Sequence, residues 1–337
     1  MRSMRLEANI RCAHYPVVVP SIASTALLRR LPMISSYLSS RYPGNSQSRV
    51  AVREFVERVC RSYLELGLAD PNFEGNLCCG SDARYWQRLS EALLAHEILD
   101  VDLDLRPSRD GPDMLIKHKE RKVWIEVICP EPTDVPAEWL DSQANTVVNF
   151  PHEAILLRWT AAIKEKAEKL LGNPQKNHVG HIQRGVVSPH DPYVIAVNGR
   201  RLRGVFPSLY GISQFPFAVE AVFAVGPYQI SIDRNTLNST EAGHQHRPVI
   251  SNRSGSPVPA YTFLDPTFRP ISAIWAVDID ECSIVGNAKP MAVIHNPIAA
   301  NPIQEGVLPA YWEYVATKCG DDEYALEKRP GRLSIQV

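Results

Sequence analysis

Two acidic side chains in one short segment carry the clearest chemical signal in the sequence. Asp113 comes directly after Gly-Pro, and Glu126 lies 13 positions later, inside the apolar run Val-Trp-Ile-Glu-Val-Ile. A carboxylate within an apolar strand is costly unless it is paired or binds a metal ion, so Glu126 needs a partner. The pieces Met-Leu-Ile and Lys-Val-Trp-Ile-Glu-Val flank a charged turn, and if they pair as a hairpin, both carboxylates reach one end of a sheet.

Two carboxylates at one end of a sheet suit a hard divalent cation. Mg²⁺ uses few protein ligands and keeps several of its waters, so two carboxylates, a backbone carbonyl and water suffice, and Mn²⁺ is the alternative cation. A cation bound in this way generates hydroxide and stabilises the charge that builds up on a phosphodiester. The sequence therefore predicts a site for Mg²⁺ or Mn²⁺ at Asp113 and Glu126, whose chemistry is suited to a phosphodiester.

The elements that would position these carboxylates follow from hydrophobic periodicity. Apolar residues at helical spacing predict helices, and short apolar or alternating runs bounded by turn residues predict strands. We expect helices at about 48–67, 81–99 and 152–171, and strands at about 101–105, 122–129, 193–197 and 271–279. Helices and strands in this order predict an α/β fold in which helices flank a central mixed sheet.

The sequence favours one domain, because no linker divides it. Residues 1–47 are expected to form an irregular N-terminal arm, and residues 48–337 a single α/β domain with its core at about 80–200. The segment 233–260 is rich in Asn, Ser, His and Gly, which predicts a long loop. We expect the proline-rich remainder to wrap around the outside.

The motif GPD, followed by IEV on the next strand, resembles the PD-(D/E)XK nuclease superfamily. In that superfamily Pro-Asp opens one strand and Glu-X-Lys lies on its neighbour. The succession GPD, WIEVICP, ILLRWTAAIKEK and DPYVIAVN is also similar to a group of uncharacterised bacterial proteins with a degenerate version of this core. The resemblance covers about residues 80–200. It implies a restriction-endonuclease-like core with N- and C-terminal elaborations, and a metal-dependent nuclease, which is a hydrolase.

One position departs from the superfamily motif. Ile128 stands two residues after Glu126, where the motif has lysine. Strand side chains alternate, so Ile128 shares the face of Glu126 and no ammonium occupies that place. Either the lysine comes from elsewhere, or the chain is a catalytically silent module that binds nucleic acid or protein on the same scaffold.

The helix at about 152–171 offers a replacement lysine. At 100° per residue, Lys166 falls near the centre of an apolar stripe that includes Trp159, whereas Lys164 and Lys169 are predicted to point sideways or outward. Related folds carry the lysine on this helix. The resemblance therefore makes Lys166 a candidate to contact a phosphate or the metal-bound water.

Two further side chains complete the predicted site. Arg158, at the margin of the same stripe, is a candidate to clamp a phosphate with two hydrogen bonds. The resemblance implies an accessory metal-binding glutamate at about the place of Glu91, on the helix at 81–99. The helical angle of Glu91, however, puts it off the apolar face of that helix.

Each of these residues also has a structural interpretation. An aspartate after Gly-Pro, such as Asp113, is typical of a turn or cap. Glu126 can form a structural ion pair with Lys122 or Arg158. Lys166 can extend its stem along a partly buried helix and hold its ammonium in water. A third possibility is therefore an α/β protein in which the two carboxylates are only structural.

Composition and charge set broad limits. The 337 residues carry a formal net charge of −1, so nucleic acid would need a local basic groove as its binding surface. Seven cysteines without a framework spacing are typical of a reducing compartment. The apolar N-terminal run is cut by Pro20 and followed by Arg29 and Arg30, unlike a signal peptide. No apolar run approaches ~18 residues, so we expect a cytoplasmic protein that does not contact a membrane.

Overall fold

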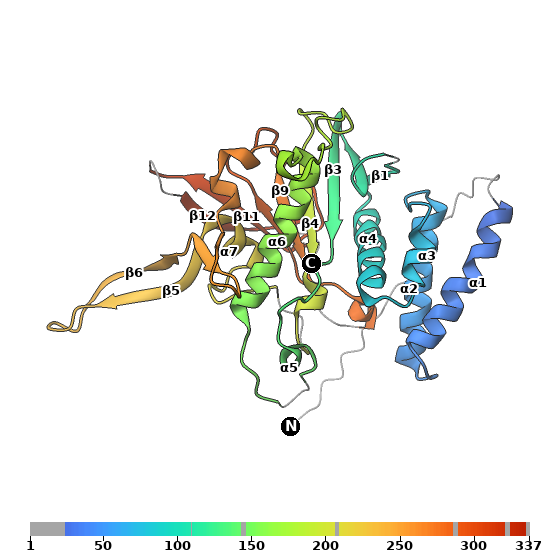
Figure 1. The fold of residues 1–337 in the computed structure, drawn as a ribbon, viewed down its shortest axis with the longest axis horizontal. Coiled ribbons are helices and arrows are strands. Elements are labelled where there is room, and N and C mark those ends of the chain that lie inside the picture. The colour runs from blue at the N-terminus through green and yellow to red at the C-terminus, as the bar shows by residue number, and fades with distance from the viewer. Residues whose placement is uncertain are drawn as a thin grey trace, which may run out of the picture.

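The computed structural model describes residues 24–108, 110–142, 146–205, 209–285, 289–320 and 324–334. An eight-stranded mixed sheet has the strand order β1-β2-β3-β4-β9-β10-β11-β12 (Figure 1). Its strands are β1 (Asp104–Arg106), β2 (Met114–His118), β3 (Arg121–Ile128), β4 (Tyr193–Asn198), β9 (Ala273–Val277), β10 (Met291–His295), β11 (Trp312–Lys318) and β12 (Tyr324–Pro330). The predicted α/β class with a central mixed sheet is confirmed.

Helices cover both faces of this sheet and enclose two apolar cores (Figure 1). One face carries α1 (Ser24–Arg41), α2 (Gln47–Glu65), α3 (Phe73–Leu77) and α4 (Asp82–Asp100). The other face carries α6 (His152–Leu171) and α7 (Phe217–Phe223), and the short α5 (Ala137–Leu140) precedes them. Short 3-10 helices connect these elements at Pro174–Lys176, Gly199–Leu202, Thr262–Leu264, Pro266–Phe268, Glu281–Val285 and Arg332–Ser334.

Strands β2 and β3 form the predicted hairpin. They pair antiparallel from Met114 opposite Ile125 to His118 opposite Arg121, which confirms the prediction for this segment. Strand β3 pairs on its other side with β4 in parallel. The hairpin is therefore built into the sheet, with apolar side chains of β3 on both of its faces.

The hairpin opens before β3 ends. Strand β2 begins at Met114, opposite Ile125, so residues 126–128 of β3 pair with β4 on one side and with no strand of the described chain on the other. Backbone groups on such an edge need other partners when they are buried. The edge of β3 is thus the place where side chains and ligands can approach the sheet.

Helix α6 packs on the sheet as predicted. Its apolar stripe, with Trp159 only 1% exposed, belongs to the core on that face of the sheet. Lys166 is buried within the same stripe. The helix therefore aims one lysine at the sheet face that carries Glu126.

The predicted N-terminal arm is not irregular throughout. Residues 24–41 form α1, and Ile34 and Leu38 are buried in the core on the α4 side of the sheet. Together with Tyr42 they recur every four residues, which is the spacing of one helix face. The part of the predicted arm before residue 24 lies outside the described residues.

The predicted loop at 233–260 is also wrong in part. It contains β6 (Ser239–His246), which pairs with β5 (Val225–Ile232) in a two-stranded ribbon that projects from the body of the molecule (Figure 1). It also contains β7 (Val249–Ser251) and β8 (Pro257–Pro259), which pair with each other. Strand β6 is polar and mostly exposed, and β7 and β8 have only three residues each, so none of them shows the buried alternation from which strands are predicted.

Two further predictions about the sheet need correction. The C-terminal residues do not wrap around the outside, because β10, β11 and β12 extend the central sheet beyond β9. The strand expected at 101–105 is reduced to β1, because residues 101–102 form a turn after α4, in which Asp102 has a positive φ of 54°.

Candidate active site

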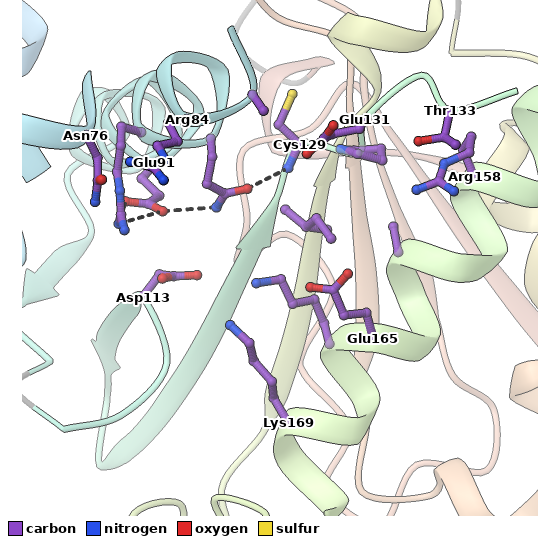
Figure 2. A pocket seen from close by; sticks show the side chains of 17 residues that line it. Asn76, Arg84, Glu91, Asp113, Cys129, Glu131, Thr133, Arg158, Glu165 and Lys169 are labelled. Atoms are coloured by element: carbon purple, nitrogen blue, oxygen red, sulfur yellow. Dashed lines mark hydrogen bonds and ion pairs between the residues drawn. The ribbon is translucent and has the colours of Figure 1, made fainter. Parts of the chain in front are cut away.

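A pocket of about 660 Å³ lies where β2 leaves β3, between α4 and α6 (Figure 2). The sequence places charged and amide side chains on both helices, and they face this pocket. The lining residues that matter most are Gln87, Arg88 and Glu91 from α4, Asp113 before β2, Ile128 and Cys129 at the end of β3, and Arg158, Glu165, Lys166 and Lys169 from α6. Charges of both signs therefore meet in one cavity.

Glu126 is held by two lysines from α6. Lys166 Nζ donates to Glu126 Oε1 at 2.9 Å, and Lys169 Nζ donates to the same oxygen at 2.7 Å. The side chains of Glu126 and Lys166 are 3% and 6% exposed, whereas that of Lys169 is 43% exposed. We call these three residues the carboxylate–lysine cluster. The two lysines are the ionic partners that a carboxylate in an apolar strand requires.

The two lysines keep Glu126 ionised. Burial alone would raise the pKa of Glu126, but Lys166 and Lys169 outweigh it and lower that pKa below its ordinary value. Burial likewise works to lower the pKa of Lys166, and Glu126 and Asp113 outweigh it and raise that pKa. The cluster is therefore a carboxylate with ammonium partners at neutral pH.

Asp113 has a different electrostatic environment. Burial raises its pKa to about 8, and the negative charges of Glu126 and Glu91 add to the effect. Its Oδ2 accepts a hydrogen bond from the Val127 amide at 2.7 Å, on the open edge of β3. Asp113 therefore satisfies the sheet edge and carries a proton over part of the neutral range.

Gln87 closes the rest of that edge. Its Nε2 donates to the Val127 carbonyl at 3.1 Å, and its Oε1 accepts from the Cys129 amide at 3.0 Å. The side-chain amide thus takes the hydrogen bonds that a neighbouring strand would take. The same Nε2 also donates to Glu91 Oε1 at 2.9 Å, so Gln87 connects α4 to the pocket.

Glu91 was predicted to lie off the apolar face of its helix, and it lies there beside Gln87 and Arg88; its burial was not predicted. It is 3% exposed, lines the pocket and accepts hydrogen bonds from Gln87 and Arg88. Burial raises the pKa of Glu91, and this outweighs the opposing effect of Arg88. A polar partner on the same helix allows a carboxylate to be buried where hydrophobic periodicity alone excludes it.

Arg158 lines the same pocket but lies apart from the carboxylates. It precedes Lys166 on α6 by about two turns, or roughly 12 Å along the axis. Figure 2 shows it beside Thr133, away from Asp113 and Lys169. Its Nε is buried and has no hydrogen-bond partner among the described residues. Arg158 is therefore available to an anion at the far end of the pocket, and it does not pair with Glu126.

Sequence reasoning missed Lys169. It was predicted to point sideways or outward, but it reaches Glu126 as closely as Lys166 does. The available signal was its spacing, because residues three apart on a helix are neighbours and a long side chain can bend toward a buried charge. Lys166, in contrast, lies in the buried stripe as predicted, and it contacts Glu126.

The side chains around the pocket can supply only a small number of ligands to a cation. No group of three or more His, Cys, Asp or Glu side chains in the described parts of the chain is arranged to hold a metal ion. The hydrogen bonds that described residues make use Asp113 Oδ2 and Glu126 Oε1. Asp113 Oδ1 and Glu126 Oε2 therefore remain for a ligand. Two carboxylate oxygens and water fit the habit of Mg²⁺, and they do not fit an all-protein cage.

Comparison with protein-family models, with curated proteins and with solved structures gives no match for this chain. Within the described residues, no helix is both long and apolar enough to cross a membrane.

Proposed function

We propose that this chain is a Mg²⁺-dependent nuclease of a degenerate PD-(D/E)XK type, or a protein derived from one, and that it cleaves phosphodiester bonds in the pocket between α4 and α6. The observation that carries the proposal is the contact of Lys166 Nζ with Glu126 Oε1 at 2.9 Å. It brings an ammonium from α6 to the carboxylate whose own strand offers only Ile128 at the motif position.

Each side chain has a separate role in this proposal. Asp113 and Glu126 would hold Mg²⁺ or Mn²⁺ through the oxygens that their protein partners leave free. The cation supplies a water of lowered pKa and neutralises charge on the phosphoryl group. Lys166 would orient an attacking water and stabilise developing negative charge, because it is buried and fixed by Glu126.

Two residues at the sides of the pocket would assist. Arg158 can bind a phosphate at the far end with two parallel N–H groups. Glu91 is an accessory carboxylate, held by Arg88, on the α4 side. A local groove of this kind would compensate for the absence of a basic field around the whole chain.

The second candidate is a catalytically silent module that binds nucleic acid or protein on the same scaffold. Two observations favour it: Ile128 stands at the motif position, and each proposed metal ligand already accepts a hydrogen bond from the protein. We propose the cytoplasm as its location in either case. The cysteines in the described part of the chain are all free, which supports a reducing compartment.

The test is a cleavage assay on mixed single- and double-stranded DNA and RNA with Mg²⁺ or Mn²⁺. Asp113→Asn keeps an acceptor for the Val127 amide and removes the charge, and Lys166→Met keeps the stem and removes the ammonium. We expect each variant to lose about 100-fold or more in turnover. Lys164→Met, on the exposed side of the same helix, is the matched control. Wild-type protein that binds the metal but cleaves none of these substrates would leave the silent module as the better account.

A further inference from the structure

Lys166 and Lys169 share one carboxylate partner, and this bears on ligand binding. Both ammonium groups contact the same oxygen, Glu126 Oε1, at 2.7 and 2.9 Å. Within the carboxylate–lysine cluster, two ammonium groups face one carboxylate, so the cluster by itself carries a net positive charge. A negatively charged ligand in contact with Lys169 would balance that charge.

Exposure decides which of the two lysines can change partner. The Lys166 side chain is 6% exposed and lies in the apolar stripe of α6, so its ammonium would lose its ion pair with Glu126 on moving. The Lys169 side chain is 43% exposed, lines the pocket and lies one turn nearer the end of the helix. Its ammonium can therefore remain hydrated while it moves from one anion to another.

The chemistry of the pocket favours phosphate as the second anion. Lysine binds phosphate as a compact point charge on a flexible stem, and Arg158 on the same helix offers a fork of N–H groups. Lys169 follows Arg158 by roughly 16 Å along the helix axis. This separation exceeds the ~3.4 Å rise per nucleotide along one strand of a duplex, so the two residues would contact different phosphates.

We propose that Lys169 is a phosphate-binding residue: when a nucleic-acid strand enters the pocket, its ammonium leaves Glu126 for a phosphate oxygen, and Lys166 alone stays on Glu126. This inference rests on the proposed function and assigns it a ligand contact. The two lysines then have different roles. Lys166 is the fixed partner of the carboxylate, and Lys169 is the exchangeable one.

The experiment measures binding without cleavage. A short fluorescent single-stranded DNA oligonucleotide is titrated with protein in EDTA, and the anisotropy-derived Kd is followed as a function of salt concentration. Lys169→Gln should reduce the slope of log K against log salt by about 0.7, which is the loss of one phosphate contact on a single strand. At about 0.1 M salt that change corresponds to roughly fivefold weaker binding.

Two matched variants separate a phosphate contact from a general change of charge. Lys164→Gln removes the same charge from the same helix at an exposed position and should leave the slope unchanged. Lys169→Arg keeps a cation and should restore the wild-type slope. Melting curves for every variant should show that Lys166 maintains the fold when Lys169 is replaced.

The outcomes distinguish this inference from the nuclease proposal. An unchanged slope in Lys169→Gln, or a wild-type protein that does not bind the oligonucleotide, overturns the role of Lys169. If wild-type protein cleaves nucleic acid while Lys169→Gln binds and cleaves normally, the nuclease stands and the inference fails. If wild-type protein cleaves nothing but Lys169→Gln loses one salt-dependent contact, the phosphate contact stands and the nuclease fails.

Discussion

Two buried ion clusters lie near the carboxyl ends of neighbouring parallel strands, and they differ in their surroundings. The carboxylate–lysine cluster lies at the open edge of β3. The second, which we call the arginine–aspartate cluster, joins Arg203 to Asp278 and Asp280 beyond β4 and β9. Arg203 Nη2 contacts Asp280 Oδ2, and its Nε lies 3.3 Å from Asp278 Oδ1. These three side chains are at most 6% exposed.

The arginine–aspartate cluster is closed by the protein itself. Asp280 Oδ1 accepts from the Cys282 amide, and its Oδ2 also lies 3.1 Å from Arg200 Nε. Arg203 borders a cavity of only about 10 Å³, whereas the carboxylate–lysine cluster faces a pocket of about 660 Å³. Buried ion pairs are therefore not by themselves a sign of function. An ion pair with one half-exposed member, next to an open pocket, is the stronger sign.

The largest expected effect is a difference in the free energy of unfolding between variants of the two clusters. Arg203→Met leaves two buried aspartates without their shared arginine, and we expect it to lower the free energy of unfolding by about 3–5 kcal/mol. Glu126→Gln should cost less, about 1–3 kcal/mol, because water from the pocket can reach the lysines. Urea denaturation measures both values. Equal losses would mean that the open pocket does not relieve the desolvation of Lys166.

The second-largest expected effect is the pH dependence of metal binding. The Asp113 carboxyl binds a cation only when ionised, and its pKa of about 8 means that protons compete below that pH. Calorimetric titration with Mg²⁺ should give affinities that rise about tenfold per pH unit up to about pH 8 and then level off. A flat profile between about pH 6 and 8 would show that Asp113 is not a ligand.

The same carboxyl has the opposite effect on stability. Its pKa in the folded protein is above the ordinary value of 3.8, so the folded state holds a proton that the unfolded state has lost. The free energy of unfolding should therefore fall as pH rises from about 4 to about 8, and Asp113→Asn should remove this part of the slope. Melting curves across that range provide the control for the binding data.

The position of the lysine gives a smaller effect. Ile128→Lys combined with Lys166→Met returns the ammonium to the strand, and we expect it to recover about tenfold in cleavage over Lys166→Met alone. Full recovery is not expected, because Ile128 is 7% exposed and packs in the α6 core, where a lysine costs stability. A double variant that folds but cleaves no better than Lys166→Met would indicate that the ammonium acts only from α6.

The smallest effect concerns competition for Glu126. Lys169→Met removes one ammonium from Oε1, and we expect Mg²⁺ to bind up to about fivefold more tightly, since partly exposed ion pairs contribute little. Metal titration of wild type, Lys169→Met and the control Lys164→Met measures this difference. Weaker binding in Lys169→Met would mean that Lys169 helps to hold the site together.

The sequence was sufficient for the local elements of the site. The β2–β3 hairpin, α6 and the burial of Lys166 beside Glu126 follow from periodicity within a short stretch of chain. The roles of Glu91 and Gln87 could not be predicted in this way. Glu91 is buried because Gln87 and Arg88 accompany it, and Gln87 is needed because β2 stops opposite Ile125.

The mispredicted parts of the fold lie mostly in mixed or exposed segments. Strand β10 is a short buried apolar run, a local pattern that was available, whereas β11 and β12 mix charged and apolar residues and are partly exposed. In the exposed ribbon, β5 alternates apolar and polar residues at Tyr228, Ile230 and Ile232, but β6 is polar and mostly exposed, so it has no hydrophobic alternation to identify it. The half-exposed Lys169 escaped prediction for a related reason: a helical angle gives the direction of the backbone position and does not give the reach of a long side chain.

The location of a bound cation tests the central claim most directly. Crystals soaked in millimolar Mn²⁺ would be measured at a wavelength where manganese scatters anomalously. We expect an anomalous peak in contact with Asp113 and Glu126, with Lys166 still beside Glu126. A protein that shows no peak in this pocket, or a peak only at other residues with both lysines unmoved on Glu126, would contradict the assignment of this site as a metal-dependent active site.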